Sequence, residues 1–235
     1  MKLVLIVLFL MATKVFAETD LHLIYVNGVA EKTVDPNMVH INIESWAKAS
    51  TAKQAQERQA LLYDAIKLTI EKFKIKKEDV QTEGFSVYPE HTYDQKTQTN
   101  KMTGYKVSHR ILITYRKIDD AGVVLDSLAT SKGDIGGVNI SSVSLDFDKK
   151  SVVENSVLAE AVKNARAKAE ELAKAADVII KTVHKIQFSS SAPPIAEPMY
   201  EKAAMRMMSD SAAPPTELSS GKIKVRVDVQ MEFEI

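Results

Sequence analysis

The sequence has no cysteine among its 235 residues, which excludes a disulfide framework, a thiolate metal site and a cysteine nucleophile. It also has no excess of charge. Because 31 basic side chains balance 31 acidic ones, a strongly basic protein that binds nucleic acid is not expected. After residue 17 no apolar run approaches the roughly 20 residues that cross a bilayer, so we expect no transmembrane span in the mature chain.

The first 17 residues have the pattern of a secretory signal peptide. Lys2 supplies the positive start, residues 3–11 are continuously apolar, and Val15 and Ala17 form a small-residue cleavage site. The apolar run is too short to span a bilayer, which leaves an uncleaved anchor as the weaker alternative. We therefore expect cleavage after Ala17 and export, to the periplasm if the source has two membranes.

The clearest strand lies at the end of the chain. Apolar residues occupy every second position from Ile223 to Ile235, and charged or polar residues fill the positions between, which is typical of an antiparallel strand with one buried face. Similar patterns predict six further strands: 21–34, 38–46, 82–93, 102–115, 138–147 and 178–188. The turn triplet Asp35-Pro36-Asn37 and a polar stretch at 94–101 indicate that the first four form two hairpins.

Three helices are expected between these strands. Thr51 and Gln54 have the spacing of a capping box, and an apolar stripe follows: Ala55, Leu62, Ala65, Ile66, Thr69, Ile70 and Phe73. Asp119 or Asp120 caps a short second helix. The longest helix covers about 149–176, and its stripe is Leu158, Ala161, Val162, Ala165, Ala169, Leu172, Ala173 and Ala176.

This order of elements predicts an α+β fold, in which an antiparallel or mixed sheet carries a few helices on one face, including the long helix of the C-terminal half. We assign residues 1–17 to the signal peptide and residues 18–235 to a single domain. Residues 189–220 contain five of the seven prolines, which predicts a long mobile loop between the last two strands.

This predicted loop holds four methionines: Met199, Met205, Met207 and Met208. Thioether ligands suit Cu(I), so a periplasmic copper or redox buffer is one hypothesis. The alternatives are an adaptable apolar contact with a sheet edge or a neighbouring subunit, and a simple tether. Because no histidine or cysteine lies in the loop, we predict no metal site and no cofactor, with these four methionines as the candidates if one exists.

No group of residues predicts catalysis. Ser50 and Lys53 match the Ser-x-x-Lys motif of penicillin-recognising enzymes, but the partner motifs are missing, and Ser50 or Thr51 is better explained as a helix cap. The five histidines lack the spacing of a metal site and are expected at the surface: His22, His40, His91, His109 and His184. The first predicted hairpin leaves a cross-strand pair of His22 and His40 open as an alternative. Trp46 is expected to anchor a core or an interface.

Several segments carry a family resemblance, in order along the chain. They are 26–28 (Val-Asn-Gly), 79–89 (Asp-Val-Gln-Thr-Glu-Gly-Phe-Ser-Val-Tyr-Pro), 103–105 (Thr-Gly-Tyr) and the helical run 165–173. With them, the chain resembles the SIMPL-domain family of exported bacterial proteins over roughly residues 21–235. The region 131–139 departs from the family pattern.

The resemblance implies an α+β protein of the periplasm or the outer-membrane fringe, without established catalysis, that self-assembles and is associated with envelope or oxidative stress. It supplies no catalytic residues to transfer. We therefore expect a non-enzymatic protein that acts by binding or self-assembly, as a homo-oligomer or with envelope proteins as partners. A copper or redox buffer and, more remotely, a Ser-x-x-Lys hydrolase stay as alternatives.

Overall fold

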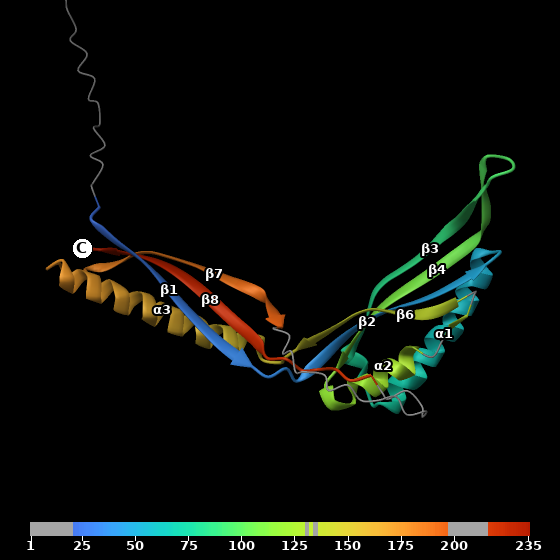
Figure 1. The fold of residues 1–235 in the computed structure, drawn as a ribbon, viewed down its shortest axis with the longest axis horizontal. Coiled ribbons are helices and arrows are strands. Elements are labelled where there is room, and N and C mark those ends of the chain that lie inside the picture. The colour runs from blue at the N-terminus through green and yellow to red at the C-terminus, as the bar shows by residue number, and fades with distance from the viewer. Residues whose placement is uncertain (1–20, 130–131, 134–135, 197–215) are drawn as a thin grey trace, which may run out of the picture.

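The computed structural model describes residues 21–129, 132–133, 136–196 and 216–235. These residues form an elongated molecule with one antiparallel sheet toward each end (Figure 1). One sheet has the strand order β1-β8-β7, and the other has the order β3-β4-β2-β6-β5. The expected α+β class is confirmed, and every strand pair is antiparallel.

The elements agree closely with the sequence patterns. In the three-stranded sheet, α3 (Lys150–Ala175) packs on β1 (Leu23–Val34) and β8 (Ile223–Glu234), and β7 (Thr182–Ala196) completes the sheet. The five-stranded sheet consists of β2 (Met38–Ala49), β3 (Val80–Asp94), β4 (Thr99–Tyr115), β5 (Lys132–Gly133) and β6 (Gly136–Asp146). Its helices are α1 (Ala52–Lys72) and α2 (Ala121–Ala129), and two single turns of 3₁₀-helix precede β3 and α2: η1 (Lys77–Asp79) and η2 (Ile118–Asp120).

The first predicted hairpin is wrong. β1 and β2 are joined by the turn triplet at 35–37, but β1 pairs with β8 from Leu23↔Glu234 to Val34↔Ile223, whereas β2 pairs with β4 and β6. The turn therefore leads the chain from one sheet into the other. A local turn signal cannot distinguish these two outcomes, because both reverse or redirect the chain between two strands. The second hairpin, β3 with β4, is confirmed.

The long helix lies unusually close to β1. At Gly28 a Cβ atom would stand 2.0 Å from the carbonyl oxygen of Ala161 and 2.7 Å from the Cβ of Ala165, so only hydrogen fits between strand and helix. The predicted alanine seam is confirmed, since four of its members are buried: Ala161, Ala165, Ala169 and Ala173. Other members of the predicted stripe differ, because Val157 rather than Leu158 is buried, Leu172 is 50% exposed and Ala176 is exposed.

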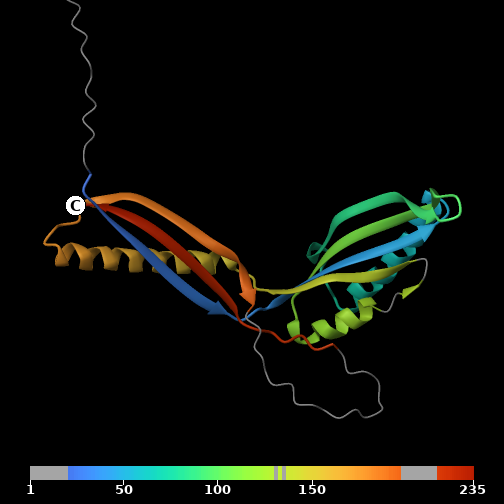
Figure 2. The same cartoon turned by 45° about the horizontal axis from the view of Figure 1, so that its top comes forward.

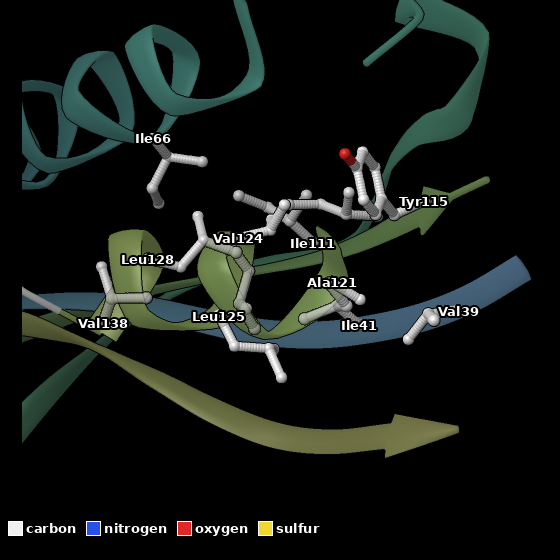
Figure 3. Packing of buried hydrophobic residues seen from close by; sticks show 12 residues of the cluster. Val39, Ile41, Ile66, Ile111, Tyr115, Ala121, Val124, Leu125, Leu128 and Val138 are labelled. Carbon is white, nitrogen blue, oxygen red and sulfur yellow. The ribbon is translucent and has the colours of Figure 1, made fainter. Parts of the chain in front are cut away.

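A second apolar core joins the five-stranded sheet to its helices. Ile41 of β2 and Ile111 of β4 face Ile66 of α1 and Val124 of α2 (Figure 3). All four side chains are at most 2% exposed. Within the predicted stripe of α1, Ala65 is exposed and the polar residue Gln59 is buried instead.

Asp146, the last residue of β6, connects β2 to the start of α3 at the point where the chain passes between the two sheets. Its carboxylate accepts hydrogen bonds from Lys150 Nζ at 2.6 Å, the Phe147 backbone N–H at 2.8 Å and His40 Nε2 at 2.9 Å. Burial would raise the pKa of Asp146, but these hydrogen bonds outweigh it and lower the pKa below its ordinary value. Beside it, Asn37 and Asp148 exchange two hydrogen bonds.

The predicted loop at 189–220 begins too early, because residues 189–196 belong to β7. β7 continues to Ala196, and its register with β8 shifts between Ser191 and Ile195, where two prolines interrupt the ladder. At the other end, Thr216 donates from its backbone N–H and its hydroxyl to the carboxylate of Asp126 on α2. Residues 197–215 lie outside the described residues.

Candidate functional site

Three apolar side chains of β7, those of Val183, Ile186 and Phe188, lie on the helix face of the sheet but are not covered by α3. The register pairs Val183 with Phe233, Ile186 with Met231 and Phe188 with Val229, so each of these residues shares a face with its buried β8 partner. A helix is about 10 Å wide and neighbouring strands are about 4.8 Å apart, so one helix covers about two strands of three. The exposed fractions are 38% for Val183, 51% for Ile186 and 63% for Phe188. We call these three side chains the β7 face.

The two edges of this sheet differ in how they are protected. At the β1 edge, two α3 side chains donate hydrogen bonds to backbone carbonyl oxygens that a further strand would otherwise use. Lys168 Nζ donates to Asn27 O at 2.8 Å, and Asn164 Nδ2 donates to Val29 O at 3.0 Å. At the β7 edge no further strand is paired within the described residues. Charges and prolines are common protections of an open edge, and β7 has a single charged residue, Lys185, with its prolines confined to positions 193 and 194. The β7 edge is therefore available for pairing with another strand.

The groove between β1 and α3 is a second apolar feature of the same sheet. It has a volume of about 540 Å³ and is lined by Val26, Asn27, Ala167, Lys168, Glu171 and Leu172. The exposed Leu172 side chain is part of this groove. Lys168, which lines the groove, donates from Nζ to the Asn27 carbonyl oxygen of β1.

Ser50 and Thr51 of the Ser-x-x-Lys match lie at the start of α1, where both bond Gln54. Thr51 caps α1, as its side chain accepts a hydrogen bond from the Gln54 backbone N–H at 3.3 Å. The Ser50 hydroxyl donates to Gln54 Oε1 at 2.9 Å. The helix-cap interpretation of this motif is therefore confirmed.

His22, His91 and His184 are exposed, as predicted, but the other two histidines are not. His22 and His40 are not cross-strand neighbours, because the hairpin that would pair them does not form. His40 instead bonds Thr114 and Asp146. His109 is 7% exposed rather than at the surface.

His109 is the centre of a buried polar network that sequence reasoning missed. Its Nδ1 lies 3.1 Å from Gln59 Nε2, and its Nε2 lies 3.0 Å from Thr82 Oγ1. Gln59 also donates to Ser45 Oγ at 3.0 Å, and the Tyr63 and Phe85 rings flank the imidazole. Burial lowers the pKa of His109, so it is a neutral residue that fixes α1 on the sheet. The available signal was Gln59, a polar residue within the apolar stripe of α1.

The structure describes only some of the other residues singled out in the sequence. Met199, Met205, Met207 and Met208 lie outside the described residues, so the metal hypothesis stays a prediction. Within the described part of the chain no cluster of three or more His, Asp or Glu side chains could hold a metal ion. Among the same residues, no helix has the length and apolar character needed to cross a membrane. Trp46 is half-buried on the sheet face opposite α1, where the Lys48 and Lys106 ammonium groups lie over its ring.

Comparison with known proteins covers nearly the whole described chain. The family model SIMPL, described as a protein of unknown function (DUF541), matches residues 24–233. The 26 kDa periplasmic immunogenic protein of Brucella melitensis is 31% identical over 219 residues, which are 90% of this chain and 84% of that protein. The uncharacterized protein YggE of Escherichia coli K12 is 25% identical over 222 residues, which are 90% of this chain and 83% of that protein. The chain belongs to the SIMPL family.

Proposed function

We propose that this protein is exported to the periplasm and acts there without catalysing a reaction, by assembling with further copies of itself through β7. Export is supported by the signal-peptide pattern of residues 1–17 and by the Brucella relatives, which are named periplasmic. We include a role in envelope or oxidative stress in the proposal, and only the family resemblance supports that role.

The observation that carries the proposal is the uncovered β7 face beside a strand edge that has one charged residue and, before position 193, no proline. Fully burying a side chain such as Ile186 or Phe188 contributes about 1.5–3 kcal/mol, and a second strand would also satisfy the free backbone groups. Two copies of β7 paired about a two-fold axis at Gln187 would place Ile186 of each copy opposite Phe188 of the other. Because Lys185 is the only charged residue of β7, such pairing brings few like charges together.

The non-enzymatic part of the proposal is supported by how the nucleophile candidate is used. The Ser50 hydroxyl is engaged by Gln54 in a helix-cap arrangement. The buried His109 has both ring nitrogens bonded within the protein and is 7% exposed, so it presents no face to a substrate.

Light scattering after size-exclusion chromatography tests the assembly. The mature chain, residues 18–235, is compared with the variant I186S/F188S and with the control L61S/L68S, which removes two exposed leucines of α1 (71% and 67% exposed). The wild type and the control are expected to have a mass of at least two chains, and I186S/F188S the mass of one. A wild type that stays monomeric at high concentration, or an I186S/F188S variant that assembles like it, would contradict the proposal.

A further inference from the structure

The two sheets, each with its helices, form two halves of the molecule that share no core. The apolar cluster of the five-stranded half and that of the three-stranded half have no residue in common. Among the described residues, no helix or strand of one half packs extensively on an element of the other half. The angle between the halves therefore depends on the chain segments that pass from one to the other.

Two of these segments lie side by side and act as one joint. Residues 35–37 connect β1 to β2, and residues 147–149 connect β6 to α3. The two segments are bonded to each other, because Asn37 Nδ2 donates to Asp148 Oδ1 at 2.8 Å and the Asp148 backbone N–H donates to Asn37 Oδ1 at 3.0 Å. Two connections at one place fix where the halves meet, but they leave rotation about that place free.

A third segment, residues 216–222, runs from the surface of α2 to the start of β8 at Ile223 (Figure 2). We call it the strap. The Asp126 carboxylate of α2 accepts hydrogen bonds from the Thr216 hydroxyl at 2.6 Å and from the Thr216 backbone N–H at 3.1 Å. One turn earlier in α2, a Cβ atom on Gly122 would stand 1.6 Å from the Thr216 carbonyl oxygen, so the strap touches the helix backbone. The strap is therefore a separate tie, bound to the five-stranded half at one end and continuous with the three-stranded sheet at the other.

The strap is held at few points. Its one large apolar side chain, Leu218, packs on the core of the five-stranded half and is only half-buried, while Thr216 is exposed. A pocket of about 410 Å³ remains between the strap and the start of α2, lined by residues 118–119, 122–123 and 216–220. Because the anchors are one carboxylate and one half-buried leucine, the strap can leave α2 without unfolding either core.

We propose that the strap is a latch that sets the angle between the two halves. While Thr216 is bound to α2, the halves keep the angle that Figure 1 shows. When the strap is released, the halves pivot about the joint at residues 35–37 and 147–149, and the direction in which the β7 face points changes with them. The latch is a property of a single chain and does not depend on self-assembly.

Distances between the halves within single chains test the latch. Because the sequence has no cysteine, Leu68→Cys on α1 and Glu160→Cys on α3 place one spin label at an exposed position of each half. Pulsed electron double resonance then measures the distribution of distances between the two labels. Labelled chains are diluted with an excess of unlabelled chain, so the distances are those within one chain, whether or not the protein assembles. With the native strap, one narrow distribution is expected.

Two strap variants and one control are compared in this labelled chain. Gly122→Ala expels the strap, because the three atoms nearest to the new methyl group all belong to Thr216, and Asp126→Ala removes both hydrogen bonds. Each is expected to widen the distance distribution at least about twofold. The control Asp64→Ala removes an exposed carboxylate of α1 that bonds Lys67, and it is expected to leave the distribution unchanged.

An unchanged distribution in both strap variants would overturn the latch. A broad distribution with the native strap would also overturn it, because the strap would then hold no angle, and so would equal broadening in Asp64→Ala. Circular dichroism checks that each variant keeps the helix content of the wild type, and if Gly122→Ala loses helix, Asp126→Ala decides alone. The size measurements that test assembly through β7 do not enter this result, so the two proposals can fail separately.

Discussion

Phe188 and Val229 are register partners on one face of the three-stranded sheet, yet Val229 is fully buried and Phe188 is 63% exposed. The difference comes from the position of α3 over β1 and β8. The β7 side chains could be buried only by a second helix beside α3 or by a second chain. Because both the side chains and the strand edge are left open, the second chain is the solution that the proposed assembly adopts.

Charges placed on the β7 edge should weaken this assembly. Gln187 and Ser189 lie on the solvent face, opposite Gln230 and Asp228 of β8. In the variant Q187K/S189K, lysines of two paired copies repel each other, and the dissociation constant of the assembly is expected to rise about tenfold or more at low salt. Light scattering over a concentration series measures this change. The rise should shrink in 1 M salt, since screening reduces the repulsion.

Gln230→Lys is the matched control for this prediction. It adds the same charge to the same face, but on the central strand β8 rather than the edge. It is expected to leave the dissociation constant within about twofold of the wild type. If Q187K/S189K and Q230K weaken the assembly equally, the contact involves the sheet face and not the β7 edge.

Gly28→Ala should destabilise the packing of α3 on β1. The new methyl group would meet the Ala161 backbone oxygen at 2.0 Å, so the helix must move away from the strand. Overpacking of this kind costs about 1–3 kcal/mol in the free energy of unfolding. Urea denaturation with an unchanged m-value measures the loss. Asn27→Ala, at the exposed neighbouring position, should change the free energy by less than about 0.5 kcal/mol.

How far the sequence predicts this fold depends on whether a signal is local. The alternation that starts at Ile223 and the alanine seam around Ala165 each report one face of one element, and both predictions are confirmed. The partner of β1 is not a local property. Val34 directly precedes the turn that leads to β2, but it pairs with Ile223 near the other end of the chain.

The candidate surfaces were not predictable for the same reason. Phe188 is part of an ordinary strand pattern, and only the width of α3 leaves it exposed. Gln59 alone gave a usable signal, since a polar residue in an apolar stripe needs a buried partner.

His109 should make the protein less stable as the pH falls from about 7 to 5. In the folded state burial lowers its pKa, while in the unfolded chain the imidazole takes up a proton near its ordinary value of about 6.5. The unfolded state therefore binds more protons below that pH, and the free energy of unfolding decreases. Chemical denaturation at several pH values measures the slope. His109→Asn should have a shallower slope than the wild type between pH 6.5 and 5, and an identical slope would contradict the buried neutral histidine.

Asp146→Asn should weaken the connection between the two sheets in a different pH range. The wild-type carboxylate accepts from Lys150, His40 and the Phe147 N–H, and removing its charge is expected to cost about 1–3 kcal/mol at pH 7. Because the folded-state pKa of Asp146 is lowered, its contribution is complete above the unfolded pKa of about 3.9 and is lost as the pH falls through the folded value. The stability difference between wild type and variant should therefore disappear in acid. The control is Asp35→Asn, which removes an exposed carboxylate (83% exposed) that lies 4.0 Å from the Lys222 ammonium group. This substitution should cost less than about 1 kcal/mol in the free energy of unfolding at any pH. An equal loss in the two variants would show that Asp146 has no special part in the connection between the sheets.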